Sequence, residues 1–350
     1  MSQYFAFSGF SPFQLGLIMA LPPLTSIYAN YIYFGAAIKF STKKVVRLFA
    51  LGSLVSLWFV FLLKGFTMKF LFMTISAFFQ GAFLPLIESA MIDYSHRSAL
   101  SYSKIRIWGT IGYVITAFAA GRVIRFGFVW LFVIFSVIFV MINILSKKLH
   151  QGTSERQKIQ LRGVDKKFLA LFVVITVSVG FNLFNSIFLP VVVKERSYDL
   201  SLVGTMFSLM ALSELPFLLN AEKIQRKLTG TILFLSGVFM VGTRLILVPL
   251  SWSQTSLILV QMLHGWTFIV IYYSTVHLMK ENLKGQSLLS TQTVFWIALQ
   301  GIGPLMGSTI GGIFVEKIGT NNAYLFFGMI CLGMAVYTFY FFKKHFRRIR

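Results

Sequence analysis

Long apolar runs recur along the whole chain, and they constrain its fold more than any other feature. Each run holds about 20 residues, the length that an α-helix needs to cross a hydrocarbon layer of about 30 Å at a rise of about 1.5 Å per residue. Charged residues make up only 12% of the 350 residues, against about 25% in a typical water-soluble domain. The sequence therefore predicts an all-α polytopic membrane protein, because the runs recur too often for a signal peptide or a single anchor.

The spacing of these runs predicts about eleven membrane helices. We expect them at residues 11–37, 47–63, 69–92, 105–123, 127–146, 168–190, 201–221, 229–250, 256–279, 289–315 and 322–342.

The segments between these helices differ in basic charge. When alternate segments are assigned to opposite sides of the membrane, 24 of the 32 Lys and Arg residues fall on one side and seven on the other, with Arg244 inside an apolar run. Cytoplasmic loops are enriched in Lys and Arg, so the first side is predicted to be cytoplasmic, the amino terminus outside and the carboxyl terminus inside. The formal charge of +22 is attributed to this bias and to anionic lipid head groups, and not to nucleic-acid binding.

The longest polar stretch, KKLHQGTSERQKIQLRGVDKK, divides the chain into two parts. It is rich in Lys, Arg, Gln and Ser, a composition that does not bury a core. We therefore expect an N-terminal half of five helices at residues 1–146, a cytoplasmic linker at 147–167, and a C-terminal half of six helices at 168–350.

The two halves resemble one another in sequence. FFQGAFLPL in the third predicted helix aligns with MLHGWTFIV in the ninth, so that Gln80 takes the place of His264. Gly112 and Gly121 are nine residues apart in the fourth helix, and the tenth helix repeats this glycine spacing. Repeated helical halves with a binding site at their interface are a common plan of secondary transporters. The repeat predicts two pseudo-symmetric bundles and a carrier for a small solute.

Three segments carry a resemblance to a known family. KIRIWGTIGY, SELPFLL and QMLHGWTF are similar to the major facilitator superfamily, and within it to the phenylpropionate-permease-like and lactose-permease-like proton symporters. The resemblance covers residues 3–342, and its most specific part is the motif of Arg106, Trp108, Gly109 and Gly112. It implies a twelve-helix fold, alternating access and proton coupling.

The same resemblance implies that the family's first helix is missing from this sequence. The internal repeat agrees, because it leaves the sixth predicted helix, 168–190, without a partner in the first half. The chain is then either an active carrier or a truncated remnant without transport activity, and both alternatives stay open here.

Three ionisable side chains lie inside predicted helices of the C-terminal half. A charge at the centre of a membrane helix costs about 2.5 to 3.5 kcal/mol on insertion scales, so each is expected to face a cavity or a partner. Glu214 lies near the middle of the seventh helix, and Arg244 and His264 lie at similar depths on the eighth and ninth helices, so that these two are able to meet. A proton-coupled carrier needs a carboxyl group that binds a proton when dehydrated and releases it when hydrated or paired. We predict that these three residues couple protons; the alternative is a structural hydrogen-bonding role between helices.

The resemblance adds a comparison for this group. The lactose-permease-like symporters place an arginine and a histidine on these two helices beside a carboxylate. Their histidine helix also carries an acid one turn later, where this chain has Thr267. The proton site is then expected at Glu214, or coupling is lost.

A second group of charges lies near the predicted cytoplasmic face. Glu88 and Asp93 lie at the end of the third helix, and Arg106 begins the fourth from the same side. An ion pair between either acid and Arg106 is a candidate gate. The alternative is that these are solvated interfacial charges.

Uncharged polar residues and glycines give the remaining candidates. The polar side chains either bind the solute or hydrogen-bond between helices, whereas glycines permit close helix packing. The substrate-cavity candidates are Asn182, Asn185, Gln261 and Gln80, and the helix-packing candidates are Gly109, Gly112, Gly121, Gly303, Gly307 and Gly312.

Several classes of function are disfavoured. Five scattered histidines and no HExxH motif argue against a membrane-embedded enzyme, so we expect no enzymatic activity, no metal and no cofactor. The single cysteine, Cys331, excludes a disulfide within the chain. The expected partners are a small-molecule substrate, protons and the lipid bilayer of the inner, cytoplasmic cell membrane, and the resemblance implies a monomer.

Overall fold

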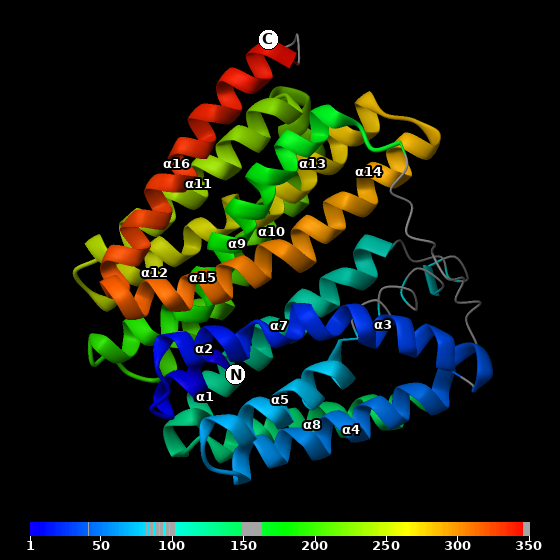
Figure 1. Cartoon of the computed structure of the whole chain (residues 1–350), viewed down its shortest axis with the longest axis vertical. Helices are drawn as coiled ribbons and strands as arrows, with labels where there is room; N and C mark the ends of the chain where they lie inside the picture. Colours follow the sequence, from blue (N-terminus) through cyan, green and yellow to red (C-terminus); the bar gives the residue numbers. More distant parts are fainter. Residues whose placement is uncertain are drawn as a thin grey trace. The chain divides into compact units, whose positions relative to one another are not determined.

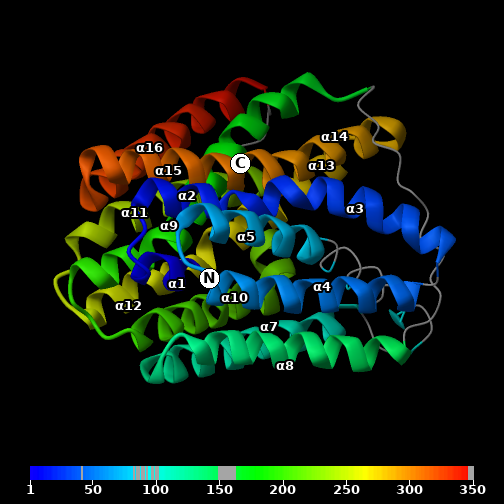
Figure 2. The ribbon, with the colours of Figure 1, turned by 60° about the horizontal axis from the view of Figure 1, so that its bottom comes forward.

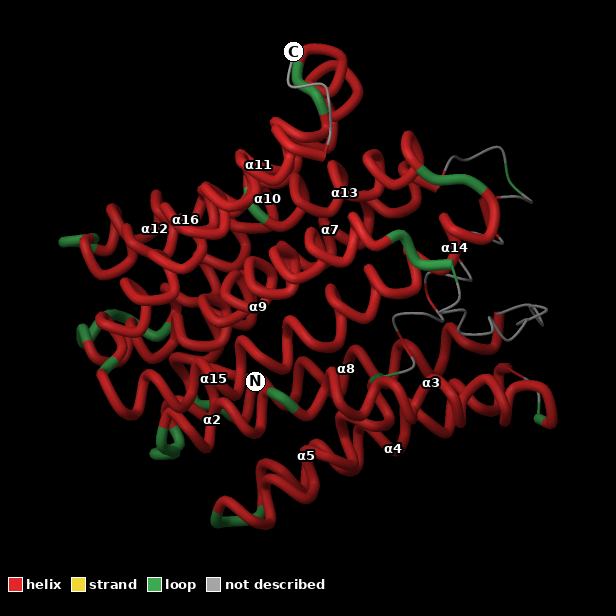
Figure 3. Tube along the Cα trace, turned by 45° about the horizontal axis from the view of Figure 1, so that its top comes forward, coloured by secondary structure: helices red, strands yellow, loops and turns green. Residues whose placement is uncertain are grey.

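The computed structural model of the chain is built from helices and short connections (Figure 3). It describes residues 1–40, 42–81, 83, 87, 91, 94–95, 98, 102–148 and 163–345. These ranges contain no strand. Eight of the described helices are long and apolar enough to cross a membrane, which confirms the predicted all-α polytopic class.

The described helices form two compact units (Figure 1). The first unit comprises Met1–Gly16 and Lys158–Arg350, and the second comprises Leu17–Gln157. This division differs from the predicted halves at the amino terminus, because the first 16 residues pack with the C-terminal part of the chain. Two hydrogen bonds explain the difference: Gln3 Nε2 donates to Leu200 O at 2.7 Å, and Lys194 Nζ donates to Ala6 O at 2.8 Å.

The second unit is a small helical bundle. Its α4 packs against both α5 and α8, and α3 packs against α5 (Figure 2). Tyr33 and Phe49 lie in its buried core, and Trp58 Nε1 donates to Ser136 Oγ at 2.9 Å, joining α4 to α8. Its described elements are α3 (Leu21–Lys39), α4 (Thr42–Leu62), α5 (Phe66–Gln80), α7 (Tyr102–Val123), η1 (Ile124–Phe126), α8 (Val129–Leu145) and η2 (Ser146–Lys148).

The first unit holds the candidate site. Its longest helix, α9, begins at a cap in which Asp165 accepts a hydrogen bond from the backbone N–H of Lys167 at 2.8 Å. Within this unit, α11 packs against α16, and α9 packs against α15. Its elements are α1 (Ser2–Phe7), the first part of α2 (Pro12–Met19), α9 (Lys166–Glu195), α10 (Ser201–Lys227), α11 (Gly230–Leu250), α12 (Gln254–Met262), η3 (Leu263–Trp266), α13 (Phe268–Asn282), α14 (Gly285–Ile297), η4 (Ala298–Ile302), α15 (Gly303–Ile318) and α16 (Thr320–His345).

Three helices predicted as continuous are interrupted. The first is divided at Ala20 into α2 (Pro12–Met19) and α3 (Leu21–Lys39). The ninth predicted helix contains the 3₁₀ segment η3 between α12 and α13, and the tenth contains the π-helical segment η4 between α14 and α15. Gly303 follows η4, and the next residue, Pro304, has no N–H to donate, which accounts for the loss of regular α-helical hydrogen bonding there. Periodicity in the sequence does not reveal such breaks, because the apolar character continues through them.

The predicted packing glycines differ in their surroundings. A side chain at Gly307 would clash with the backbone carbonyl of Gly180 on α9, and one at Gly312 would lie 2.7 Å from Pro12 O on α2. At Gly303 the nearest atoms are also backbone carbonyl oxygens. By contrast, no atom of the described residues lies within 4 Å of a side chain placed at Gly109 or Gly112. Close backbone contacts are thus found at the three candidates of the tenth predicted helix, and the packing role of Gly121 stays a prediction.

Candidate functional site

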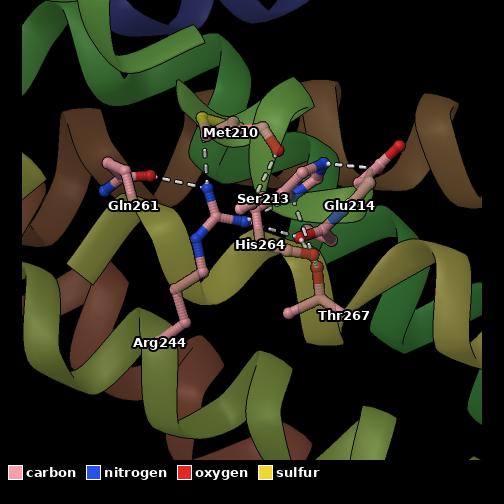
Figure 4. Close-up of polar contacts among 8 residues, drawn as sticks. Met210, Ser213, Glu214, Arg244, Gln261, His264 and Thr267 are labelled. Atoms are coloured by element: carbon pink, nitrogen blue, oxygen red, sulfur yellow. Dashed lines mark hydrogen bonds and ion pairs between the residues drawn. The ribbon is translucent and has the colours of Figure 1, made fainter. Parts of the chain in front are cut away.

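A buried arginine organises the polar centre of the first unit. Arg244 on α11 is 1% exposed, and its guanidinium group contacts four side chains (Figure 4). Nη1 donates to Asn182 Oδ1 at 2.9 Å and lies 2.9 Å from His264 Nδ1. Nη2 donates to Gln261 Oε1 at 2.6 Å and to Met210 Sδ at 3.4 Å. A buried guanidinium requires such acceptors, because its donors are otherwise left without water.

His264 joins this arginine to a carboxylate. Its Nε2 lies 3.2 Å from Glu214 Oε1, and the two side chains are 14% and 22% exposed. Arginine only donates hydrogen bonds, so the Nδ1 that faces it carries the lone pair. The proton of a neutral imidazole is then on Nε2, where it is donated to the Glu214 carboxylate. Hydrogen bonding thus assigns the tautomer of His264.

Further polar contacts extend the network along α9. Asn185 Nδ2 donates to Gln261 Oε1 at 2.9 Å, and Tyr324 OH donates to Asn185 O at 3.3 Å. Thr267 Oγ1 lies 2.8 Å from His264 O, to which it donates. We call the set Asn182, Asn185, Met210, Glu214, Arg244, Gln261, His264 and Thr267 the Arg244 network.

Local backbone features place the histidine. The η3 segment turns the chain immediately around His264, and Thr267 follows with φ −105° and ψ −96°. Gly265 permits α10 to approach, since a side chain there would clash with the backbone carbonyl of Ser213. The neighbour of Ser213 in sequence is Glu214, so this close approach brings the carboxylate to the imidazole.

The structure brings together most of the residues predicted from the sequence. Glu214, Arg244 and His264 meet, as do the three cavity candidates of the C-terminal half. The fourth cavity candidate, Gln80, belongs to the second unit, where its Nε2 donates to Ser76 Oγ at 2.7 Å. The gate candidates Glu88 and Asp93 and the side chain of Arg106 lie outside the described residues.

Sequence reasoning missed one member of the Arg244 network, Met210, and one residue that contacts the network, Tyr324. Met210 lies one turn before Glu214 on α10, a spacing that was available as a signal. Tyr324 carried no signal, because one tyrosine among 13 in an apolar chain is not distinctive. Its position on α16 beside α9 emerges only from the packing.

The chemistry available to this network is proton transfer and hydrogen bonding. It holds one carboxylate, one imidazole and one guanidinium within contact distance. Among the described residues, no group of three or more His, Cys, Asp or Glu side chains is placed to hold a metal ion.

Comparison with known proteins gives a consistent result. The sequence profile of the MFS_1 like family matches residues 1–326. The chain is 24% identical to a maltose permease of Geobacillus stearothermophilus over 332 residues, covering 92% of this chain and 84% of that protein. It is 20% identical to a probable 3-phenylpropionic acid transporter of Escherichia coli strain K12 over 326 residues, covering 89% and 84%.

Solved structures agree on the fold. The crystal structure of the nucleoside transporter NupG superposes with a TM-score of 0.77 at 17% identity, covering 98% of this chain and 93% of that one. At 17% identity this structural similarity shows a shared fold and nothing about function. Taken with the family profile over most of the chain, it shows that this protein is a multi-pass membrane protein of the MFS_1 like family, within the major facilitator superfamily of transporters.

Proposed function

We propose that this chain is a proton-coupled secondary transporter that moves a small organic solute across the cytoplasmic membrane by alternating access. The observation that carries this proposal is the line of contacts from Arg244 through His264 to Glu214. It places the three ionisable groups in one connected set, in which the protonation state of one affects the others.

Charge balance links proton uptake by Glu214 to the entry of water or solute into the Arg244 network. With a neutral imidazole between them, the positive charge of Arg244 and the negative charge of Glu214 cancel. A proton bound by Glu214 leaves the charge of the buried Arg244 uncompensated, and an uncompensated buried charge is unfavourable. Proton uptake is therefore favoured when water or a bound solute reaches the network, which is the requirement for coupling.

The tautomer of His264 adds a conformational constraint. A second proton on the imidazole would place an N–H on Nδ1, directed at the N–H donors of Arg244 only 2.9 Å away. The doubly protonated ring must therefore move away from the arginine. Protonation at His264 and separation of η3 from α11 are thus linked.

Unfilled hydrogen-bonding capacity supports a hydroxylated solute. Arg244 Nε, Gln261 Nε2 and Asn185 Oδ1 are buried and have no hydrogen-bond partner in the part of the chain that the structure describes, and all three belong to the Arg244 network. They offer two donors and one acceptor, and a hydroxyl group both accepts and donates. Among the similar proteins, the name maltose permease fits this chemistry, so we propose a sugar or similar polyol as the solute class.

Uptake into vesicles tests the proposal. Purified protein is reconstituted in liposomes whose interior is more alkaline than the medium, and radiolabelled maltose and 3-phenylpropionate serve as probes. We expect maltose to accumulate above its level in protein-free liposomes and the accumulation to end when a protonophore collapses the gradient. Equal uptake with and without the pH gradient would reject coupling. Uptake of neither probe above protein-free liposomes would favour the transport-inactive remnant.

A further inference from the structure

A pocket of the first unit lies outside the Arg244 network. Its volume is about 580 Å³, and it lies between the last four turns of α10 and the junction of α12 with η3. These two elements pack against one another and are labelled α10 and α12 in Figure 1. The α10 wall is formed by Ser213, Pro216, Phe217, Asn220, Lys223, Ile224 and Lys227, and the opposite wall by Met262, Leu263, Gly265 and Trp266.

The two ends of the pocket differ in chemistry. At the inner end, α10 and η3 meet at Ser213 and Gly265. At the other end, Lys223 and Lys227 lie one turn apart near the end of α10, so their side chains share a face about 6 Å apart. Between the two ends the walls are mainly apolar and include Phe217, Ile224 and Trp266. The pocket is thus apolar along its length and basic at its mouth.

The uncharged polar groups in the walls already have partners. Ser213 Oγ donates to Met210 O at 2.7 Å, and Asn220 Nδ2 donates to Pro216 O at 3.0 Å. Trp266 Nε1 donates to Ser236 Oγ at 2.9 Å. These bonds occupy one donor of each side chain, and the other residues between them and the lysines are mainly apolar. Most hydroxyl groups of a sugar would therefore be buried along these walls without a partner, which is unfavourable.

The ammonium groups of Lys223 and Lys227, unlike these uncharged polar groups, are available to bind a ligand. Neither Lys223 nor Lys227 forms an ion pair or hydrogen bond with the described residues, and both are exposed. The neighbouring acid, Glu222, is about 100° away around the helix from Lys223. Two unpaired cations on one face attract a single anionic group, and basic pockets between membrane helices bind anionic lipid head groups.

The length of the pocket fits one lipid leaflet. From Ser213 to Lys227 there are 14 helical steps, or about 21 Å at about 1.5 Å per residue. One leaflet contributes about 15 Å of a hydrocarbon core of about 30 Å, and the head group adds to this. An acyl chain is thus able to lie along the apolar walls while its phosphate reaches the lysines.

We propose that this pocket binds an anionic phospholipid, with an acyl chain against Phe217, Ile224 and Trp266 and the phosphate between Lys223 and Lys227. With the predicted orientation of the chain, the lipid comes from the cytoplasmic leaflet. The site does not depend on proton coupling or on the identity of the transported solute.

Lipid retention tests the proposal. Purified protein is equilibrated in micelles with equal amounts of phosphatidylglycerol and phosphatidylcholine, and native mass spectrometry counts the lipids that it retains. We expect a preference for phosphatidylglycerol in the native chain. In the variant Lys223→Gln with Lys227→Gln, this preference should fall by about 30-fold, since each basic residue near an anionic surface contributes about 1 kcal/mol. The matched control, Lys280→Gln with Lys284→Gln, removes two exposed lysines at the neighbouring connection of α13 to α14 and should retain the preference.

A second variant tests the contribution of the acyl chain separately from that of the head group. Ile224→Trp narrows the apolar part of the pocket and leaves both lysines, and it should release the lipid while the protein still elutes as one species in size-exclusion chromatography. Glycerol phosphate, which has the head group without the acyl chains, should not compete. Equal retention of the two lipids by the native chain, an unchanged preference in the double lysine variant, or competition by glycerol phosphate alone would each overturn the proposal.

Discussion

The imidazole Nε2 of His264 lies 3.2 Å from Glu214 Oε1, while the other ring nitrogen faces Arg244. The histidine therefore donates to the acid and accepts from the base, and it transmits a change at either one to the other.

Glu214→Gln should uncouple transport from protons. The amide cannot exchange a proton, yet it keeps the shape of the side chain and a carbonyl that accepts a hydrogen bond from His264. We expect accumulation driven by a pH gradient to disappear while exchange of labelled for unlabelled maltose continues. Both are measured in proteoliposomes. The control is Glu222→Gln, an exposed acid two turns further along α10, and loss of gradient-driven uptake in this control as well would contradict the assignment.

Arg244→Met should destabilise the first unit. It leaves Glu214 without its compensating charge and removes the donor shared by Asn182 and Gln261. Leaving a buried acceptor such as Asn182 Oδ1 without its donor costs about 1 to 3 kcal/mol. Adding Glu214→Gln should recover part of this loss, because the unpaired charge is then gone. The free energies of unfolding in mixed micelles complete a double-mutant cycle, and strictly additive losses would show that the two charges do not interact.

Gly307→Ala should weaken the contact between α15 and α9. A methyl group there meets the carbonyl of Gly180, which belongs to a helix backbone and moves little. Overpacking of this kind typically costs about 1 to 3 kcal/mol. Gly333→Ala on α16 is the control, because no described atom lies within 4 Å of its new methyl group. It should be neutral or slightly stabilising in the same thermal unfolding measurement, since alanine favours helix.

Labelling of introduced cysteines tests the predicted orientation. Cys331 is buried and should react little. Trp252 is 87% exposed at the connection between α11 and α12, which is predicted to be external. A membrane-impermeant maleimide should label Trp252→Cys in intact cells, and Lys284→Cys only after permeabilisation. The reverse pattern would invert the topology.

The fold was largely predictable from the sequence. In a lipid bilayer, apolar runs of this length satisfy their backbone hydrogen bonds by forming helices. The predicted fold class is confirmed, and the bounds of most described helices agree with the predicted ones within a few residues. The breaks at η3 and η4 were not predicted, because the apolar character of the sequence continues through both of them.

The site was predictable in part. The depth of Arg244 and His264 in neighbouring helices predicted their contact, which the structure shows at 2.9 Å. Their roles in coupling stay a prediction. The surrounding hydrogen bonds were beyond sequence reasoning, since polar groups such as Asn185 and Gln261 choose partners only once four helices have packed.

The most direct test of the central claim is to detect protonation of the Glu214 carboxylate. Infrared difference spectra of the reconstituted protein, recorded as the pH is lowered, report the carbonyl stretch of each carboxyl group that becomes protonated. We predict one carboxylic acid band that is present in the native chain and in Glu222→Gln and is missing in Glu214→Gln. A spectrum of Glu214→Gln that retains every acid band of the native chain would contradict the account.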